Sequence, residues 1–264
     1  ATLRQRAVIA DTLGIKSGRD LRWVAGAVLL TVLIAEFLGF ALMCWATWSY
    51  GSPLEVIWRA LFHSISAFCN AGFALSDDSL TRYGSSVPVN LVICSLVIVG
   101  GIGFPVIFDI GTRLRRRRDF WSRLSIQTKL MLIGTTWLLA IGAVSFWLLE
   151  WDEALARETL TTRILMGLFH STTCRTAGFN TVDYAALASP TLFLTIILMA
   201  IGAGPCSTGG GFKVSTLMTL VVSSWTSFRG LPRANVFKRT IPATAVRRAT
   251  ATALLFGSVG IVAL

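Results

Sequence analysis

A short segment occurs twice in this chain, each time with a glycine whose backbone could take part in binding a cation. Residues 61–73 read LFHSISAFCNAGF, and residues 168–179 read LFHSTTCRTAGF. Rings of backbone carbonyl oxygens can replace the hydration shell of a potassium ion. Because glycine tolerates the backbone angles that turn successive carbonyls toward one axis, Gly72 and Gly178 are the leading candidates. The alternative is a pair of ordinary turn glycines between packed helices.

A second polar stretch, residues 201–216, reads IGAGPCSTGGGFKVST and interrupts an apolar run. Its glycines and its proline predict a break in a helix. Lys213 does not directly follow a glycine, as a phosphate-binding loop requires, so the stretch does not indicate a nucleotide site. A polar plug with one cation could obstruct a cation path by sterics and charge. The alternative is a packing break without function, because glycine is frequent in membrane helices.

The composition is that of a membrane protein. Hydrophobic residues make up 54% of the chain and charged residues only 14%, whereas soluble domains carry about 25% charged residues. About 20 apolar residues cross the hydrocarbon as a helix. We expect spans over residues 23–45, 87–110, 128–149 and 190–222, and another from residue 243 onward. The first residues are polar and basic, unlike the apolar core of a signal peptide.

The basic residues are clustered. Of 24 lysines and arginines, 18 fall within residues 1–22, 112–129 and 224–248, while most acidic residues lie in the intervening loops. Basic loops remain on the cytoplasmic side of a membrane, so the clusters predict one cytoplasmic face. The net charge of +11 is therefore interpreted as topology and contact with lipid headgroups, with no nucleic acid as partner.

Two short apolar segments, residues 53–68 and 159–173, do not fit a simple alternation of spans. Segments of this length are more often re-entrant than spanning. Each repeat then consists of a span, a half-helix, an extended loop and a span. Non-helical backbone at membrane depth persists only where it is buried or lines an aqueous cavity. A half-helix also directs the negative end of its dipole at that cavity, which favours a cation.

Four segments resemble, in chain order, motifs of the Trk/Ktr/HKT superfamily of potassium transporters, most closely the membrane subunit of bacterial Ktr-type systems. They are SISAFCNAGFAL (64–75), GGIGFPVIFDI (100–110), RTAGFNT (175–181) and GPCSTGGGFKVST (204–216). The resemblance implies an all-α polytopic membrane protein whose repeated span–pore helix–filter loop–span units surround a pseudo-fourfold cation pore. It implies potassium uptake through that pore and no enzymatic activity.

The resemblance also assigns residues to roles. The filter strands are Cys69, Asn70, Ala71, Gly72 and Phe73, and Arg175, Thr176, Ala177, Gly178 and Phe179. The gating loop spans residues 202–213 and includes Gly202, Gly204, Pro205, Cys206, Ser207, Thr208, Gly209, Gly210, Gly211 and Lys213. The family usually has glycine at the position of Cys206. Arg175 is expected to point behind the filter, because an unpaired cation in the pore would repel potassium.

The expected organisation has six parts. They are a cytoplasmic segment (1–22), a pore repeat (23–111), a basic cytoplasmic loop (112–127), a second pore repeat with the gating loop (128–228), a cytoplasmic loop (229–242) and the first span of an incomplete repeat (243–264). Compared with the family's four repeats, these match the second and third. We therefore expect the sequence to be an internal portion of a longer polypeptide.

The resemblance further implies the ions and partners. Potassium is the permeant ion, with sodium as an activator or a competing ion. The membrane subunit forms a homodimer in the bacterial inner membrane, with its basic loops cytoplasmic, and sits on a cytosolic ring of nucleotide-binding regulatory subunits. Residues 113–118 are a candidate surface for that ring.

Other polar residues leave alternatives open. Glu36, inside the first span, either packs or lines a path. His63 and His170 occupy matching positions, which favours a shared structural hydrogen bond over metal ligation. The five cysteines show no metal-ligand spacing and no disulfide framework. The alternative function is a secondary transporter of a small solute or sodium with discontinuous helices, although its repeats would normally be inverted.

Overall fold

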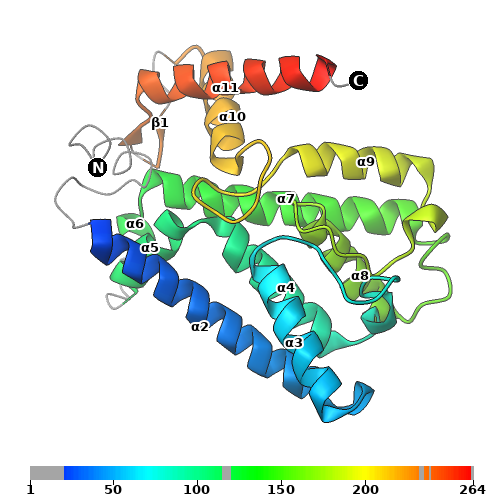
Figure 1. The fold of residues 1–264 in the computed structure, drawn as a ribbon. Coiled ribbons are helices and arrows are strands. Elements are labelled where there is room, and N and C mark those ends of the chain that lie inside the picture. The colour runs from blue at the N-terminus through cyan, green and yellow to red at the C-terminus, as the bar shows by residue number, and fades with distance from the viewer. Residues whose placement is uncertain (1–20, 115–119, 232–234, 238, 263–264) are drawn as a thin grey trace.

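The computed structural model describes residues 21–114, 120–231, 235–237 and 239–262, most of them helical (Figure 1). Helix α2 (Leu21–Thr47) is the longest. Its 27 residues rise by about 40 Å, more than the roughly 30 Å of a bilayer's hydrocarbon core. Large apolar side chains along it are exposed, and Trp23 and Trp45 near its two ends fit the interfacial aromatic belts of a membrane span.

The first repeat consists of α2, η1 (Trp48–Tyr50), α3 (Pro53–Phe68), η2 (Thr81–Tyr83) and α4 (Val87–Ile102). Helix α2 packs against both α3 and α4. The core between them includes Met43, Phe68 and Ile93, and it is completed by Phe179 from the second repeat. The two repeats therefore share one hydrophobic core next to the repeated segments.

The second repeat has a similar order, with a long helix, a short helix, a 3-10 helix and an interrupted apolar segment. It consists of α7 (Ile126–Glu150), α8 (Leu160–Thr173), η4 (Tyr184–Ala186), α9 (Ser189–Ala200) and α10 (Val214–Phe228). Helix α7 packs against α8, α9 and α10, and α8 also packs against α4 of the first repeat. As the sequence predicts, residues 201–213 break the apolar run into the two helices α9 and α10.

The span expected over residues 87–110 consists of two helices joined by a bend that was not predicted. Helix α4 ends at Ile102, and α5 (Phe104–Arg113) leaves it at an angle of 96°. Gly103 has a φ of 96°, and the N–H of Phe104 is donated to the Cys206 carbonyl, 3.2 Å away, in the loop after α9. Pro105 then lies in the first turn of α5, where its missing N–H costs no helical hydrogen bond. The residues on both sides of the bend, up to Ile110, are largely apolar, so the apolar run does not mark it.

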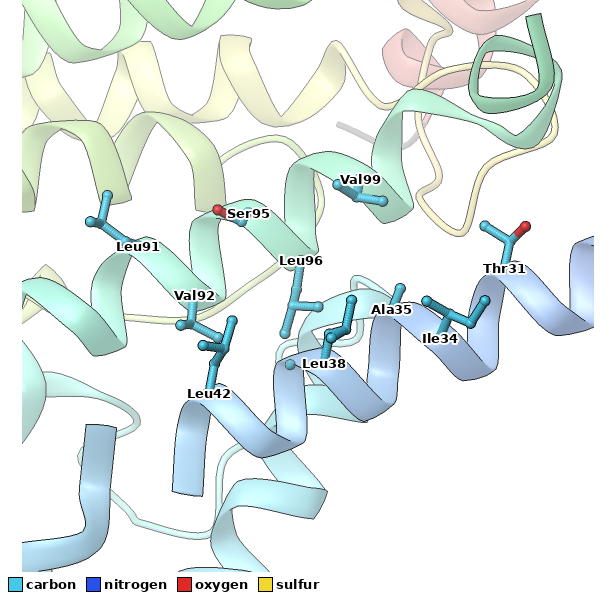
Figure 2. A pocket seen from close by; sticks show the side chains of 11 residues that line it. Thr31, Ile34, Ala35, Leu38, Leu42, Leu91, Val92, Ser95, Leu96 and Val99 are labelled. Atoms are coloured by element: carbon cyan, nitrogen blue, oxygen red, sulfur yellow. The ribbon is translucent and has the colours of Figure 1, made fainter. Parts of the chain in front are cut away.

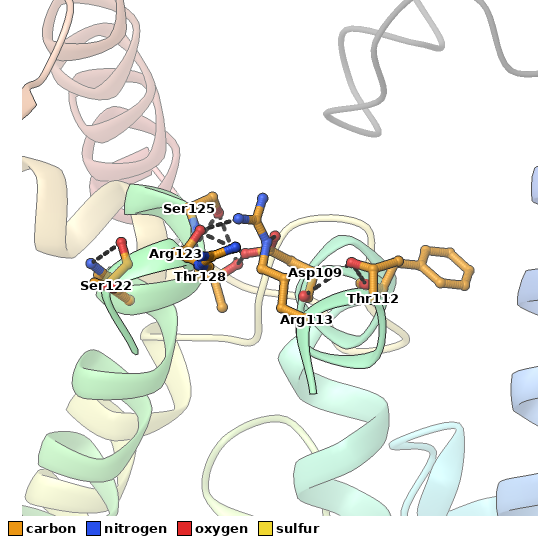
Figure 3. Close-up of polar contacts among 9 residues, drawn as sticks. Asp109, Thr112, Arg113, Ser122, Arg123, Ser125 and Thr128 are labelled. Atoms are coloured by element: carbon orange, nitrogen blue, oxygen red, sulfur yellow. Dashed lines mark hydrogen bonds and ion pairs between the residues drawn. The ribbon is translucent and has the colours of Figure 1, made fainter. Parts of the chain in front are cut away.

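Helix α5 is tied to the start of α7 through Asp109 (Figure 3). One carboxylate oxygen accepts from the Ser125 N–H at 2.8 Å and from the Thr128 hydroxyl at 2.7 Å. The other accepts from Arg113 Nε at 2.5 Å. Arg113 also donates to the Arg123 carbonyl at the end of α6 (Phe120–Arg123). This cluster holds the bent half of the first repeat against the second repeat.

The C-terminal part contains a short antiparallel hairpin of β1 (Asn235–Val236) and β2 (Arg239–Thr240), followed by α11 (Ala243–Val262). Helix α11 packs against α10. In the described part of the chain, α2 and α7 are long and apolar enough to cross a membrane, and α4 with α5 could form a third, broken span. The span expected from residue 243 onward stays a prediction.

An apolar groove of about 540 Å³ runs between α2 and α4 (Figure 2). Leu38 and Leu96 face each other across it, and Thr31 and Ser95 supply its only hydroxyl groups. Among the described residues that line this groove, none is ionisable. A cation path therefore has to be sought elsewhere, between the repeated segments.

Candidate cation filter and gating loop

The two repeated segments leave their helices with matching backbone conformations. After α3, Asn70 and Gly72 have φ angles of 53° and 72°; after α8, Thr176 and Gly178 have φ angles of 75° and 87°. The alanine between each pair is not among the residues with positive φ. The alternation of positive φ is therefore the same in the two segments. That their carbonyls bind a cation stays a prediction.

The carbonyl groups of these strands are available. Within the described residues, the carbonyls of residues 69–72 and 175–178 accept no hydrogen bond. Cys69, Ala71 and Gly178 are exposed, so these unpaired carbonyls are open to water or to a cation as partner. Each run follows the C-terminus of α3 or α8, where the helix dipole is negative.

A hydroxyl group anchors the outer end of each strand. Ser66 in the last turn of α3 donates to the Phe73 carbonyl at 2.9 Å. Thr173 at the end of α8 donates to the Phe179 carbonyl at 2.7 Å. The first segment has one more residue than the second between hydroxyl and glycine, yet the anchor is the same. Neither Ser66 nor Thr173 was predicted to belong to the site, although a hydroxyl stands at this position in both copies.

The two strands lie side by side. A Cβ atom added at Gly72 would come within 2.1 Å of the Ala177 carbonyl oxygen. Beyond the strands, the Leu80 N–H is donated to the Asn180 carbonyl at 2.9 Å, and the Asn180 N–H to the Ser79 hydroxyl at 3.1 Å. The loops that follow the two strands therefore meet on one side of the molecule, which makes the two repeats parallel to each other.

Arg175 begins the second strand and is 6% exposed. Its Nε atom has no hydrogen-bond partner among the described residues. The expectation that it braces the filter stays a prediction, and the described contacts do not supply that brace through Nε. At the start of the first strand, the Cys69 thiol lies 3.9 Å from the Glu36 carboxylate, so Glu36 is near the strand rather than in the apolar groove.

The matching histidines are both buried and both hydrogen-bonded, but to different partners. His63 Nε2 lies 3.5 Å from the Leu75 N–H in the loop after the first strand. His170 Nε2 lies 3.1 Å from the Thr195 hydroxyl in α9. Each histidine therefore makes a structural hydrogen bond, but the partner differs between the two copies, and each bond fixes its helix, α3 or α8, to its own repeat.

The loop between α9 and α10 folds back on itself and lies against α4. Within the loop, the Gly202 N–H is donated to the Phe212 carbonyl at 3.0 Å, and the Ala203 N–H to the Gly210 carbonyl at 3.1 Å. Against α4, the Gly204 N–H is donated to the Gly101 carbonyl at 2.7 Å. The end of α4 at Gly100 and Gly101 thus contacts the loop, and this contact was not predicted from the sequence.

Two side chains of the loop bear on its mobility. Cys206 has a φ of 53°, a left-handed conformation that favours glycine over other residues. Its position is the one at which the resembling family usually has glycine. Lys213 Nζ donates to the Gly209 carbonyl at 2.8 Å, so its charge is held on the loop itself.

The chain matches one family model, TrkH, described as cation transport protein, over residues 1–263. It is 40% identical over 265 residues to Ktr system potassium uptake protein B of Vibrio alginolyticus, covering 98% of this chain and 56% of that protein. It is 36% identical over 267 residues to the protein of the same name from Bacillus subtilis strain 168, covering 99% of this chain and 58% of that protein. The chain thus spans just over half the length of these relatives.

Two further similarities agree. The potassium/sodium uptake protein NtpJ of Enterococcus hirae is 37% identical over 227 residues, with 86% of this chain and 46% of that protein covered. The crystal structure of the potassium transporter TrkH from Vibrio parahaemolyticus superposes with a TM-score of 0.69, covering 92% of this chain and 51% of that one. At 19% identity, this structural likeness establishes the fold alone.

Proposed function

Since this chain belongs to the TrkH family of cation transport proteins, we propose that it forms part of a selective transmembrane pore for potassium uptake. The observation that carries the proposal is the pair of strands at residues 69–73 and 175–179, in which φ is positive at alternate residues and the carbonyls of residues 69–72 and 175–178 are unpaired among the described residues. Potassium exchanges its hydration shell for such oxygens at little net cost, so it passes where other ions do not.

Two strands enclose only part of a ring. We infer a pseudo-fourfold pore in which this chain contributes two neighbouring span–pore helix–strand–span repeats. In this proposal the other two strands of the ring correspond to regions of the longer relatives that this chain does not match. In this arrangement the C-termini of α3 and α8 direct their negative dipole ends at the ion.

The loop over residues 202–213 is proposed as the gate. The loop is hydrogen-bonded to Gly101 of α4 and within itself. We take this arrangement as the closed position of the gate. The bend between α4 and α5 supports this role, because the Phe104 N–H freed there is donated to Cys206 in the loop. Opening then requires the loop to leave α4, and the glycines of the loop permit that change.

The ions and partners are inferred from the relatives. Two relatives are named for potassium uptake and one for potassium and sodium, so we propose potassium as permeant ion and sodium as activator or competitor. We place the protein in the bacterial inner membrane with the basic segments cytoplasmic, following the distribution of lysine and arginine. A homodimer on a cytosolic nucleotide-binding ring completes the proposal.

Potassium flux into liposomes tests the pore. The intact protein is compared with Gly178→Ser, and with Gly111→Ser as a matched control, because nothing lies within 4 Å of a Cβ at Gly111. The parent and the control are expected to pass potassium in preference to sodium, and Gly178→Ser to lose that preference. Unchanged selectivity in Gly178→Ser would remove the filter assignment, and a parent without flux would remove the pore.

A further inference from the structure

Thr208 in the loop is bonded directly to the first strand. Its hydroxyl donates to the Phe68 carbonyl at the end of α3, at 2.9 Å. The same oxygen accepts from Asn70 Nδ2, also at 2.9 Å. Its own N–H is donated to the Gly100 carbonyl of α4 at 3.2 Å. One residue of the loop thus connects the pore helix, the filter strand and the following span of the first repeat.

Asn70 depends on this contact for its position. The side chain is 8% exposed, and Nδ2 also lies 3.3 Å from the Phe68 and Val97 carbonyls. The backbone is in the left-handed region at a residue other than glycine, a conformation that persists only when its surroundings hold it. Thr208 is therefore part of what holds the first strand in its alternating conformation.

The loop reaches the second strand at the equivalent residue. Asn70 and Thr176 each stand two positions before the glycine of their strand, and both have positive φ. A Cβ at Gly209, next to Thr208, would come within 2.6 Å of the Thr176 hydroxyl. Adjacent loop residues thus contact both strands at the same level, one by hydrogen bonds and the other by close packing.

We propose that Thr208 is a positioning residue that couples the gate to the filter, so that displacement of the loop alters ion selectivity as well as flow. This inference rests on the proposed function. When the loop leaves α4, the Phe68 carbonyl loses the Thr208 hydroxyl and the Asn70 amide loses the shortest of its three hydrogen bonds, which leaves only the two 3.3 Å contacts to hold the strand in its geometry. Coupling of this kind is reciprocal. An ion that orders the strand therefore stabilises the closed loop.

The test compares Thr208→Val, which keeps the size of the side chain but removes the hydroxyl, with Thr208→Ser, which keeps the hydroxyl. The matched control is Ser207→Ala. The Ser207 hydroxyl donates only within the loop, to the Gly204 carbonyl at 2.7 Å and the Gly209 carbonyl at 3.4 Å. The measurement is the ratio of potassium to sodium permeability of the intact protein in liposomes, together with the potassium flux.

We expect Thr208→Val to lower the permeability ratio by about two- to tenfold, the effect of losing one or two hydrogen bonds. Thr208→Ser should retain the parent ratio, and Ser207→Ala should change the flux without changing the ratio. A parent ratio in Thr208→Val, or an equal fall in Ser207→Ala, would overturn the coupling while the pore itself stands. If Thr208→Val is not recovered as a monodisperse protein, Thr208→Ala is measured instead, with the same two readings.

Discussion

Gly72 and Gly178 occupy matching positions in the two strands, but their surroundings differ. Both have positive φ. A Cβ at Gly72 would overlap the backbone of the second strand, with 2.1 Å to the Ala177 oxygen and 2.8 Å to Gly178 Cα. A Cβ at Gly178 would have only an ordinary contact, 3.5 Å to Gly72 Cα. Position 72 therefore requires glycine both because of its positive φ and because a Cβ atom would overlap the second strand, whereas position 178 requires it only because of its positive φ.

This difference predicts unequal effects on stability. Gly72→Ala should lower the free energy of unfolding by about 2–6 kcal/mol, from backbone strain and overlap together, and Gly178→Ala by about 1–3 kcal/mol from strain alone. Gly26→Ala is the control, because Gly26 lies in α2 with nothing within 4 Å of an added Cβ, so it should gain up to about 1 kcal/mol. Thermal unfolding in detergent measures all three. Equal losses at the two strand glycines would contradict the observed asymmetry.

The glycines of the candidate filter could be predicted from the repeated segment, but the other residues that shape the two strands could not. The glycines stand out because only glycine tolerates many left-handed conformations. Asn70 and Thr176 share that conformation, but their residue types differ and neither is glycine, so the repeat does not mark them. The hydrogen bond between Asn70 and Thr208 joins residues 138 positions apart, and no local pattern encodes such a distance.

At the scale of elements, two junctions show what short-range patterns can and cannot reveal. The short helices α3 and α8 and the break between α9 and α10 follow from segment length and from glycine and proline content. The 96° bend between α4 and α5 was not predicted because the apolar run continues through it, although Gly103 and Pro105 at the bend are residue types that interrupt helices. Its position is stabilised from outside the run, by the loop at Cys206 and by the Asp109 cluster.

The Asp109 cluster gives a prediction for the contact between α5 and α7. Asp109→Asn keeps the shape of the side chain but replaces one acceptor oxygen and removes the charge that pairs with Arg113. We expect a loss of about 1–3 kcal/mol in stability, because these acceptor bonds are charge-assisted and the side chain is 14% exposed. The measurement is thermal unfolding in detergent.

Asp78→Asn is the matched control for this prediction. Asp78 also pairs with an arginine four residues later, Arg82, but at 3.8 Å and with a side chain that is 49% exposed. Exposed pairs of this kind contribute about 0–1 kcal/mol. A destabilisation by Asp109→Asn no larger than that by Asp78→Asn would show that the cluster does not hold α5 against α7.

For the whole molecule, the relation between the two repeats decides between the pore and the alternative transporter. Transporters with discontinuous helices often contain inverted repeats. Here the loops after the two strands meet through Leu80 and Asn180, so the repeats are parallel. The apolar segments α4–α5 and α9–α10 are both interrupted. The two interruptions contact each other through the loop between α9 and α10, and they are not related by an inverted repeat.

Parallel repeats and the basic segments together predict which side of the membrane each loop faces. Single cysteines are placed at Asp77, Glu153 and Arg239, all exposed, in a background without the five native cysteines, of which Cys69 is exposed. A membrane-impermeant thiol reagent should label the first two positions in intact cells and the third only after permeabilisation, because basic loops stay cytoplasmic. Asp77 and Glu153 belong to different repeats. If position 153 alone were protected in intact cells, the second repeat would be inverted, and the proposed parallel arrangement of the pore would be wrong.

If position 239 were labelled in intact cells, the whole protein would have the opposite orientation in the membrane, and the two repeats would still be parallel.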